Sequence, residues 1–235
     1  MVGTCVIAID EGDMHARALA LAVVVTYATC ANAAANDLRT RVIAFGGIVN
    51  GYEWADPVAF PNTGVTLHNR FGASALGTGR VSMAVRGSLR AGLEVCGCRY
   101  RVIDKADLGA GQQIRQVRSV DIEYAGAVIE VEIARSDELH WTIVGAAGAG
   151  VAVQSWDVRV ERNGVKIGGD SGAEGAPGVT LSLFGLRGIT RAVSVVVGGG
   201  TVLSGGFKGV DVGGERGDAL GLRLLHGSLG IAYEF

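Results

Sequence analysis

Hydrophobic and polar residues alternate with a period of two along much of the chain, which is the pattern of a β-strand with one buried face. The clearest run covers residues 80–95, where the odd positions are mainly apolar and the even positions mainly polar. We predict one continuous strand there.

Turn residues between alternating segments predict two hairpins. The first joins residues 120–124 to residues 129–133 through a turn at Ala125-Gly126. The second turns at Asn163-Gly164, because this dipeptide readily adopts the positive φ angles of a tight hairpin turn. Further strands are predicted at residues 179–183, 192–197, 201–203, 220–224 and 229–235, with a loop over residues 170–178.

The most apolar stretch of the chain, residues 18–35, contains no charged residue. Three interpretations stay open for residues 14–35: a buried Ala-rich helix, a Val-rich core strand, or a secretory leader that begins at Met14. As a membrane-spanning helix the stretch is marginal, since spanning takes about 20 strongly apolar residues.

Together these elements predict an all-β fold, an antiparallel sandwich or barrel with at most one N-terminal Ala-rich helix. We expect residues 1–235 to form a single β domain, with a possible weak seam near residues 104–116, where the strand pattern breaks. The apolar side of each strand should face the core. The predicted core residues are Val81, Val85, Leu89, Leu93, Ile129, Val131, Ile133, Leu181 and Leu183.

The composition excludes several classes of protein. Of the 235 residues, 49% are hydrophobic and 19% are charged, so the chain is too apolar for an intrinsically disordered protein. The net charge is -2 and basic residues are spread singly, so no stretch could track the phosphates of a nucleic acid. With so few charges, part of the surface should be covered by another subunit, a partner or lipid.

The segment Gly169-Asp170-Ser171-Gly172 resembles the nucleophile segment of chymotrypsin-like serine proteases, which are also β-barrel proteins. The resemblance implies a serine nucleophile activated by a histidine that an aspartate orients. It covers four residues, and His15, His68 and His140 lie in no matching segment. We therefore predict a surface turn at Ser171 and no catalytic residue.

Cys96 and Cys98 lie two residues apart, so on a regular strand they project to the same face. They could form a local disulfide, pair with Cys5 or Cys30, or cross-link neighbouring subunits; reduced structural thiols are the other interpretation. Their spacing lacks the paired C-x-x-C of a zinc site, so no metal is predicted.

Glu130 and Glu132 share one face of a predicted strand, an arrangement that would suit paired acid–base chemistry. They alternate with apolar residues, as on any half-solvated strand. We expect both carboxylates to be solvated, and we predict no cofactor.

At the C-terminus, Leu229, Ile231, Tyr233 and Phe235 alternate with small or acidic residues. This segment resembles the terminal strand of bacterial outer-membrane β-barrel proteins, which is recognised during insertion by a terminal aromatic residue and alternating apolar positions. Two features oppose this interpretation. Aromatic residues are only 6% of the chain, too few for two interfacial girdles, and the hairpin around Asn163 has polar flanks too short to cross a bilayer.

The sequence favours a non-enzymatic structural subunit of a viral particle, a capsid, decoration, neck or tail component of a tailed bacteriophage. We expect its chain ends and sheet edges to be covered by copies of itself and by other virion proteins. This hypothesis places the protein in the virion, assembled in the host cytoplasm, with no direct contact to nucleic acid or membrane. The alternative is a bacterial outer-membrane β-barrel protein.

Overall fold

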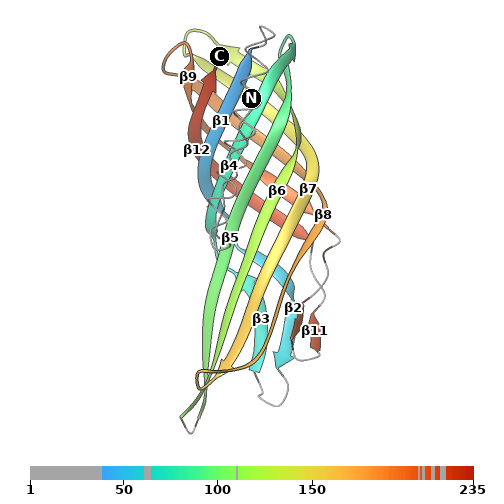
Figure 1. Cartoon of the computed structure of the whole chain (residues 1–235). Coiled ribbons are helices and arrows are strands. Elements are labelled where there is room, and N and C mark those ends of the chain that lie inside the picture. The colour runs from blue at the N-terminus through green and yellow to red at the C-terminus, as the bar shows by residue number, and fades with distance from the viewer. Residues whose placement is uncertain are drawn as a thin grey trace, which may run out of the picture.

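A closed antiparallel barrel of eight strands dominates the computed structural model, which describes residues 39–60, 65–109, 111–205, 207, 210–212, 215–217 and 221–235 (Figure 1). Around the ring the order is β1-β12-β9-β8-β7-β6-β5-β4. The strands are β1 (Thr40–Val49), β4 (Ser74–Arg86), β5 (Leu89–Gly109), β6 (Gln112–Ser136), β7 (Trp141–Arg162), β8 (Val165–Gly188), β9 (Val193–Ser204) and β12 (Leu222–Glu234).

This architecture confirms the all-β prediction and makes the fold a barrel rather than a sandwich. No helix occurs in the part of the chain that the structure describes. The three interpretations of residues 14–35 lie outside the described residues.

Four of the strands are about twice as long as the others. β5, β6, β7 and β8 have 21 to 25 residues, whereas β1, β4, β9 and β12 have 10 to 13. Pairing of β4 with β5 ends at Cys98, and pairing of β8 with β9 begins at Gly178. Beyond these points the four long strands continue as a sheet outside the ring. We call this extension the blade: residues 99–109, 112–121, 151–162 and 165–177.

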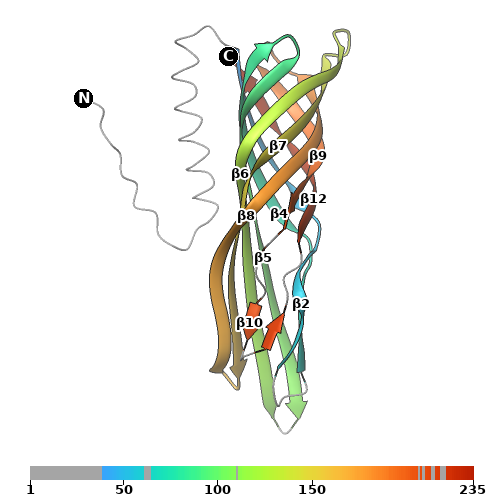
Figure 2. The ribbon, with the colours of Figure 1, turned by 90° about the vertical axis from the view of Figure 1, so that its right-hand side faces the viewer.

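Two small sheets lie beside the blade (Figures 1 and 2). β2 (Tyr52–Phe60) pairs with β3 (Val65–Phe71), and β10 (Val210–Val212) pairs with β11 (Glu215–Gly217). Phe71 at the end of β3 packs against Tyr100 of β5, with ring centroids 5.6 Å apart. The Tyr100 hydroxyl donates to the Asn50 carbonyl at 2.8 Å. The end of β3 therefore packs against the blade.

The strand boundaries correct two predictions. Residues 80–95 do not form one strand, because the chain turns at Gly87-Ser88, where Gly87 has a positive φ of 55°. Ala125-Gly126 is not a turn but lies within β6. A Cβ at Gly126 would come within 2.6 Å of the Ala149 carbonyl oxygen, so this glycine serves close strand approach instead.

The hairpin at Asn163-Gly164 is confirmed, with φ angles of 50° and 81°. Its flanking strands β7 and β8 are 22 and 24 residues long, so the prediction that they were too short to cross a bilayer was wrong. The loop predicted over residues 170–178 was also wrong, because it is part of β8. In the range of the possible seam, residues 104–109 of β5 pair with residues 112–116 of β6.

The predicted core is reversed. Of the nine residues, Val81 is buried with 5% exposure, whereas the other eight are 37% to 62% exposed. The opposite faces of the same strands are buried instead: Arg80, Glu94 and Glu130 are at most 4% exposed. The alternation was assigned to the correct parity, but the polar side points into the barrel and the apolar side points out.

Candidate functional site: an apolar outer belt around a charged interior

The outer surface of the ring is apolar over a continuous band. On β12, Leu225, Leu229 and Ile231 are exposed, while Leu224 and Ala232 on the opposite parity are buried. Neighbouring strands repeat this arrangement. We call this band the outer belt: Val85, Leu89, Leu93, Ile129, Val131, Ile133, Ile143, Val179, Leu181, Leu183, Val197, Leu203, Leu225, Leu229 and Ile231.

Aromatic and basic residues border the outer belt at the end of the barrel where the connecting turns are short. The rings of Tyr233 and Phe235 meet edge to face, with centroids 4.6 Å apart. The Arg187 guanidinium lies 5.9 Å from the centre of the Trp141 ring. Aromatic rings with a polar edge and long basic side chains suit a boundary between apolar and aqueous surroundings.

Polar residues border the outer belt on the side of the blade. Arg99 and Asp121 form an ion pair at 2.6 Å between β5 and β6. Arg223, two residues before Leu225 on β12, is exposed. The belt thus has a polar boundary at each end.

Inside the ring, Arg80 is the centre of a buried network. Its guanidinium donates to Glu94 through Nε at 2.7 Å and to Glu130 through Nη1 at 3.3 Å. Glu130 also accepts from the Ser82 hydroxyl at 2.8 Å. Because Glu130 is fully buried and paired, the expectation of a solvated carboxylate there was wrong.

The same guanidinium crosses the interior. Arg80 projects from β4, and its Nη2 donates to the Ser182 hydroxyl on β8 at 2.9 Å. β4 and β8 lie on opposite sides of the ring. The guanidinium also faces the Phe184 ring, 5.0 Å from its centre. Arg80 therefore bridges the lumen from wall to wall.

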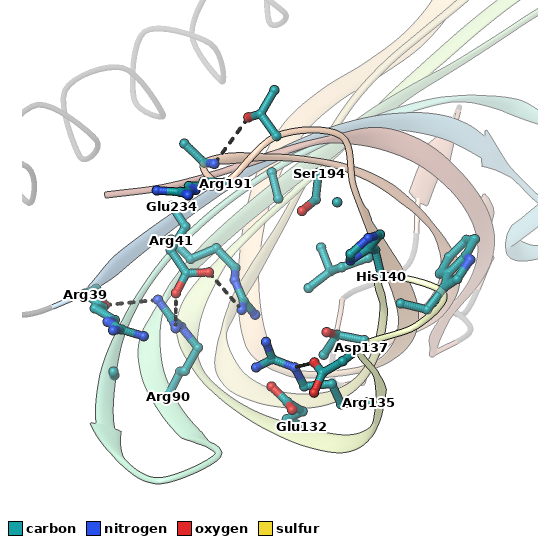
Figure 3. Close-up of a pocket in the computed structure, with 18 of the residues that line it drawn as sticks. Arg39, Arg41, Arg90, Glu132, Arg135, Asp137, His140, Arg191, Ser194 and Glu234 are labelled. Carbon is teal, nitrogen blue, oxygen red and sulfur yellow. Dashed lines mark hydrogen bonds and ion pairs between the residues drawn. The ribbon is translucent and has the colours of Figure 1, made fainter.

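Further towards the short turns, the interior opens into a polar pocket of about 410 Å³ (Figure 3). Glu234 accepts from Arg41 at 3.2 Å and from Arg90 at 3.0 Å. Arg90 also donates to the Arg39 carbonyl at 3.0 Å. The charged residues that line the pocket are Arg39, Arg41, Arg90, Arg135, Arg191, Glu132, Asp137 and Glu234, with His140 at the rim.

Among the residues whose side chains the structure describes, no histidine lies beside the protease-like segment at Ser171. Ser171 is an exposed residue of β8, opposite Asp157 of β7 on the blade. It lies within a strand, so the predicted surface turn was wrong. His140 is in the β6–β7 turn, and His226 of β12 contacts Ser228 at 2.9 Å. Neither His140 nor His226 contacts Ser171.

Cys96 and Cys98 are free thiols, buried on the inner face of β5. They share one face, as their spacing predicts. A cross-link to another subunit would require a cysteine of that subunit to reach these buried thiols. Among the described residues, no group of three potential metal ligands occurs.

Sequence reasoning missed Arg80 and Glu94 inside the ring and Arg118 on the blade, although all three are buried. The available signal was their position opposite the apolar parity of their strands. A strand with one apolar face and one charged face can be oriented in two ways. The apolar face can pack in a protein core with the charges in water, or it can face apolar surroundings while the charges pair inside a barrel. The part of the chain that the structure describes includes no helix of the length and apolarity needed to cross a bilayer.

Comparison with known proteins gives no match to a family model and none to a curated protein. Solved structures do match. The outer membrane protease OmpT from Escherichia coli aligns with a TM-score of 0.51 at 9% identity, over 84% of this chain and 97% of that chain.

Two other solved structures align less closely. Neisserial surface protein A has a TM-score of 0.42 at 12% identity, over 83% of this chain and 97% of that chain. A major outer membrane protein from Thermus thermophilus has a TM-score of 0.45 at 11% identity, over 84% of this chain and 99% of that chain.

The likeness to OmpT shows a barrel fold of the outer-membrane type. It overturns the prediction of a viral structural subunit, and with it the capsid and tail roles, the virion partners, the virion location and the absence of a membrane. The physical reason is the outer belt. The apolar surface that was assigned to contacts within a virion encircles a closed barrel.

Proposed function

We propose that this chain is an integral outer-membrane β-barrel protein whose outer belt contacts lipid. The observation that carries the proposal is the reversed polarity of the ring, with aliphatic residues such as Leu181 and Ile129 outside and Arg80 inside. Monomeric soluble proteins rarely expose contiguous apolar patches above a few hundred Å². A closed barrel also leaves no unpaired strand edge in the ring, which a bilayer requires.

The height of the outer belt supports this proposal. On β6 the outward positions are free of charge from residue 125 to residue 133, and on β12 from residue 225 to residue 233. Each segment therefore has nine residues. A tilted transmembrane strand crosses the hydrocarbon core with about 9–11 residues.

The two ends of the barrel suggest an orientation. At one end the turns are short: Gly87-Ser88, residues 137–140 and residues 189–192. At the other end lie the blade and the two small sheets. Outer-membrane barrels have short turns on the periplasmic side and longer segments outside. We therefore place the polar pocket of Figure 3 on the periplasmic side and the blade outside the cell.

The interior supports a non-enzymatic barrel closed to solutes rather than a pore. Arg80 spans the lumen between β4 and β8, and the apolar side chains of Leu76, Ile122 and Leu224 fill the interior nearer the blade. Ser171 has no histidine beside it among the described residues. We propose that the barrel anchors the blade at the cell surface.

Fractionation of expressing cells tests membrane insertion. The protein should sediment with the outer membrane, resist extraction by urea, dissolve in detergent, and run at different gel positions before and after boiling. A protein that leaves the membrane fraction with urea and shows one gel position at all temperatures would overturn the proposal. Planar bilayer recordings should show no stable conductance, and a steady open channel would contradict the closed interior.

A further inference from the structure

The polar pocket at the short-turn end of the ring has an unbalanced charge. Its volume of about 410 Å³ falls within the range of small-molecule sites. Among the described residues that line it, five are arginines and three are carboxylates, with His140 at the rim. The described lining therefore has an excess of two positive charges when His140 is neutral, which favours an anion in the pocket.

Two buried arginines form the floor of the pocket. Arg41 and Arg90 are each 8% exposed, and they donate to different oxygens of Glu234, at 3.2 and 3.0 Å. Arg41 also lies 3.7 Å from Glu130, nearer the centre of the ring. These ion pairs fix both guanidiniums. The floor is therefore an ordered polar surface, which lowers the entropy lost when a ligand binds.

Arg90 keeps one donor without a partner. Its Nη2 donates to the Arg39 carbonyl at 3.0 Å, whereas its buried Nε has no hydrogen-bond partner among the described residues. Buried polar groups in native proteins are nearly always paired with protein, with water or with an ion. An unpaired guanidinium donor in the lining of a polar pocket therefore favours a ligand that supplies an acceptor.

A β-bulge turns Arg135 into the pocket. Glu132 and Arg135 of β6 are three residues apart, so on a regular strand their side chains would point to opposite faces. The register of β6 against β7 shifts between Glu132 and Ala134, and both Glu132 and Arg135 line the pocket. Bulges re-aim side chains and are frequent beside active sites. The strand thus departs from regular pairing where it brings a further arginine to the rim.

Three exposed arginines stand around the opening (Figure 3). Arg39 precedes β1, Arg135 lies near the end of β6, and Arg191 is in the turn between β8 and β9. Arg39 and Arg191 form no ion pair with a described residue. Arg135 pairs with Asp137, whose side chain is 84% exposed, so solvent weakens this pair. The guanidinium donors of the rim are therefore available to a ligand.

The donors of the rim suit a phosphate group. Guanidinium groups bind phosphate and carboxylate through paired hydrogen bonds. A phosphate monoester has a charge of about −1.5 to −2 at pH 7 and three acceptor oxygens. It therefore matches both the excess charge and the three arginines of the rim better than a single carboxylate does. Hydroxyl groups of Thr142 and Ser194 also line the pocket and can bind a hydroxylated organic part.

We propose that the polar pocket binds a small hydroxylated phosphate monoester, with the phosphate held by Arg39, Arg135 and Arg191. The inference goes beyond the proposed insertion into a membrane and does not depend on it.

Calorimetric titration tests the proposal on the full chain in nonionic detergent micelles, after altered gel mobility has verified the fold. The probe is glucose 6-phosphate, which should bind saturably at one site per chain. Glucose and acetate should give no saturable heat, because the first lacks the charge and the second has one charge and two oxygens. Binding of glucose as tight as that of glucose 6-phosphate would overturn the proposal.

Variants of the rim test the site. Arg39→Gln with Arg191→Gln should weaken binding of glucose 6-phosphate by about ten-fold, since two exposed charge contacts are lost. The matched control is Arg187→Gln, at the same end of the barrel but against Trp141 on the outer side. The control should leave the affinity unchanged, and an equal loss in the control and the double variant would contradict the pocket as the site.

A carboxylate variant should act in the opposite direction. Glu132 forms no ion pair with a described residue, so its charge opposes an anion in the pocket. Glu132→Gln should therefore tighten binding of glucose 6-phosphate by about two- to five-fold. A damaged fold does not produce tighter binding. Glu123→Gln, on the same strand but outside the pocket, is the control, and weaker binding by Glu132→Gln would refute the charge argument.

A lipid headgroup can carry the same phosphate chemistry, so a competition separates the two sources. Phosphatidic acid added to the micelles presents a phosphate monoester on a lipid. Because the pocket lies inside the ring and the outer belt lies outside it, this lipid should not displace glucose 6-phosphate. Displacement would overturn the assignment to a soluble ligand.

Protection of a cysteine locates the bound probe. The thiol of Ser194→Cys, in the lining of the pocket, should react more slowly with a charged thiol reagent when glucose 6-phosphate is present. Ser171→Cys on the blade should react at the same rate with and without the probe. Equal protection at both positions would contradict the pocket. A correctly folded barrel that binds no glucose 6-phosphate would sink this inference and leave the proposed membrane function intact.

Discussion

Arg80 on β4 and Ser182 on β8 meet across the barrel, with the guanidinium Nη2 donating to the serine hydroxyl at 2.9 Å. The two strands lie on opposite sides of the ring. This contact, together with Glu94 and Glu130, links opposite walls through groups that are nearly inaccessible to solvent. Paired charges thus join opposite walls at this level of the interior, beside buried apolar side chains such as Phe45 and Phe184, while the outer belt faces outward.

Removing Arg80 should destabilise the barrel strongly. Arg80→Met leaves Glu94 and Glu130 buried without their main cation, and breaking a buried ion pair in this way costs about 3–5 kcal/mol. The free energy of unfolding in urea, measured in detergent micelles, checks the effect. The control is Arg159→Met, because the exposed pair of Arg159 with Asp157 contributes about 0–1 kcal/mol. Similar losses for the two variants would contradict a central role of Arg80.

Substitution by alanine should lower the stability of the barrel at one glycine of the ring and not at another. A Cβ at Gly92 of β5 would lie 1.9 Å from the Val81 carbonyl oxygen, whereas a Cβ at Gly77 of β4 would meet no atom within 4 Å. Gly92→Ala should therefore force the strands apart and cost about 1–3 kcal/mol. Gly77→Ala should be neutral or slightly stabilising. Thermal loss of the folded gel band measures both, and a neutral Gly92→Ala would refute the close approach of β4 and β5.

Trp156 should stabilise the blade locally, without affecting the ring. Trp156→Phe removes the indole hydrogen bond to Asp170 and should cost about 1 kcal/mol, which corresponds to roughly five-fold faster amide exchange along residues 168–176. Strands β1 and β12 should keep their exchange rates, because they lie in the ring. Hydrogen exchange followed by mass spectrometry checks this. Ser155→Ala on the same strand is the control, and acceleration spread over the whole barrel would argue against a local role.

A charge on the outer belt should hinder insertion. Leu181→Arg places a guanidinium among the belt residues, where an arginine at the middle of the bilayer costs about 2–4 kcal/mol. Ser171→Arg introduces the same side chain on the blade of the same strand and should cost little. Refolding yield into lipid vesicles distinguishes them. Equal yields would mean that Leu181 does not face lipid.

Much of the strand pattern could be predicted from the sequence, but its direction could not. Alternation at Ile129, Val131 and Ile133 identifies the apolar parity of β6 correctly. It is the same pattern whether that parity faces a protein core or lipid, so it cannot separate inside from outside. The positions of Arg80 and Glu130 decide the matter only when their pairing is known, and the two residues are fifty positions apart in the chain.

Glycine limited the prediction of strand length. The turn at Asn163-Gly164 was found because positive φ angles explain this dipeptide. Gly126 and Gly172 were assigned to turn-like segments, but both lie within strands, where a neighbouring backbone or ring occupies the place of a side chain. Local sequence does not distinguish these two uses of glycine, so β6 and β8 were divided into shorter pieces.

The central claim is that the outer belt is immersed in hydrocarbon while the blade is in water. Spin labels at Leu181→Cys and Ser171→Cys test it most directly, in protein reconstituted into vesicles. The label at position 181 should collide with oxygen, which concentrates in the bilayer, and hardly with a water-soluble nickel chelate. The label at position 171 should show the reverse. If both labels are equally accessible to the nickel chelate, the belt does not lie in a membrane and the account is wrong.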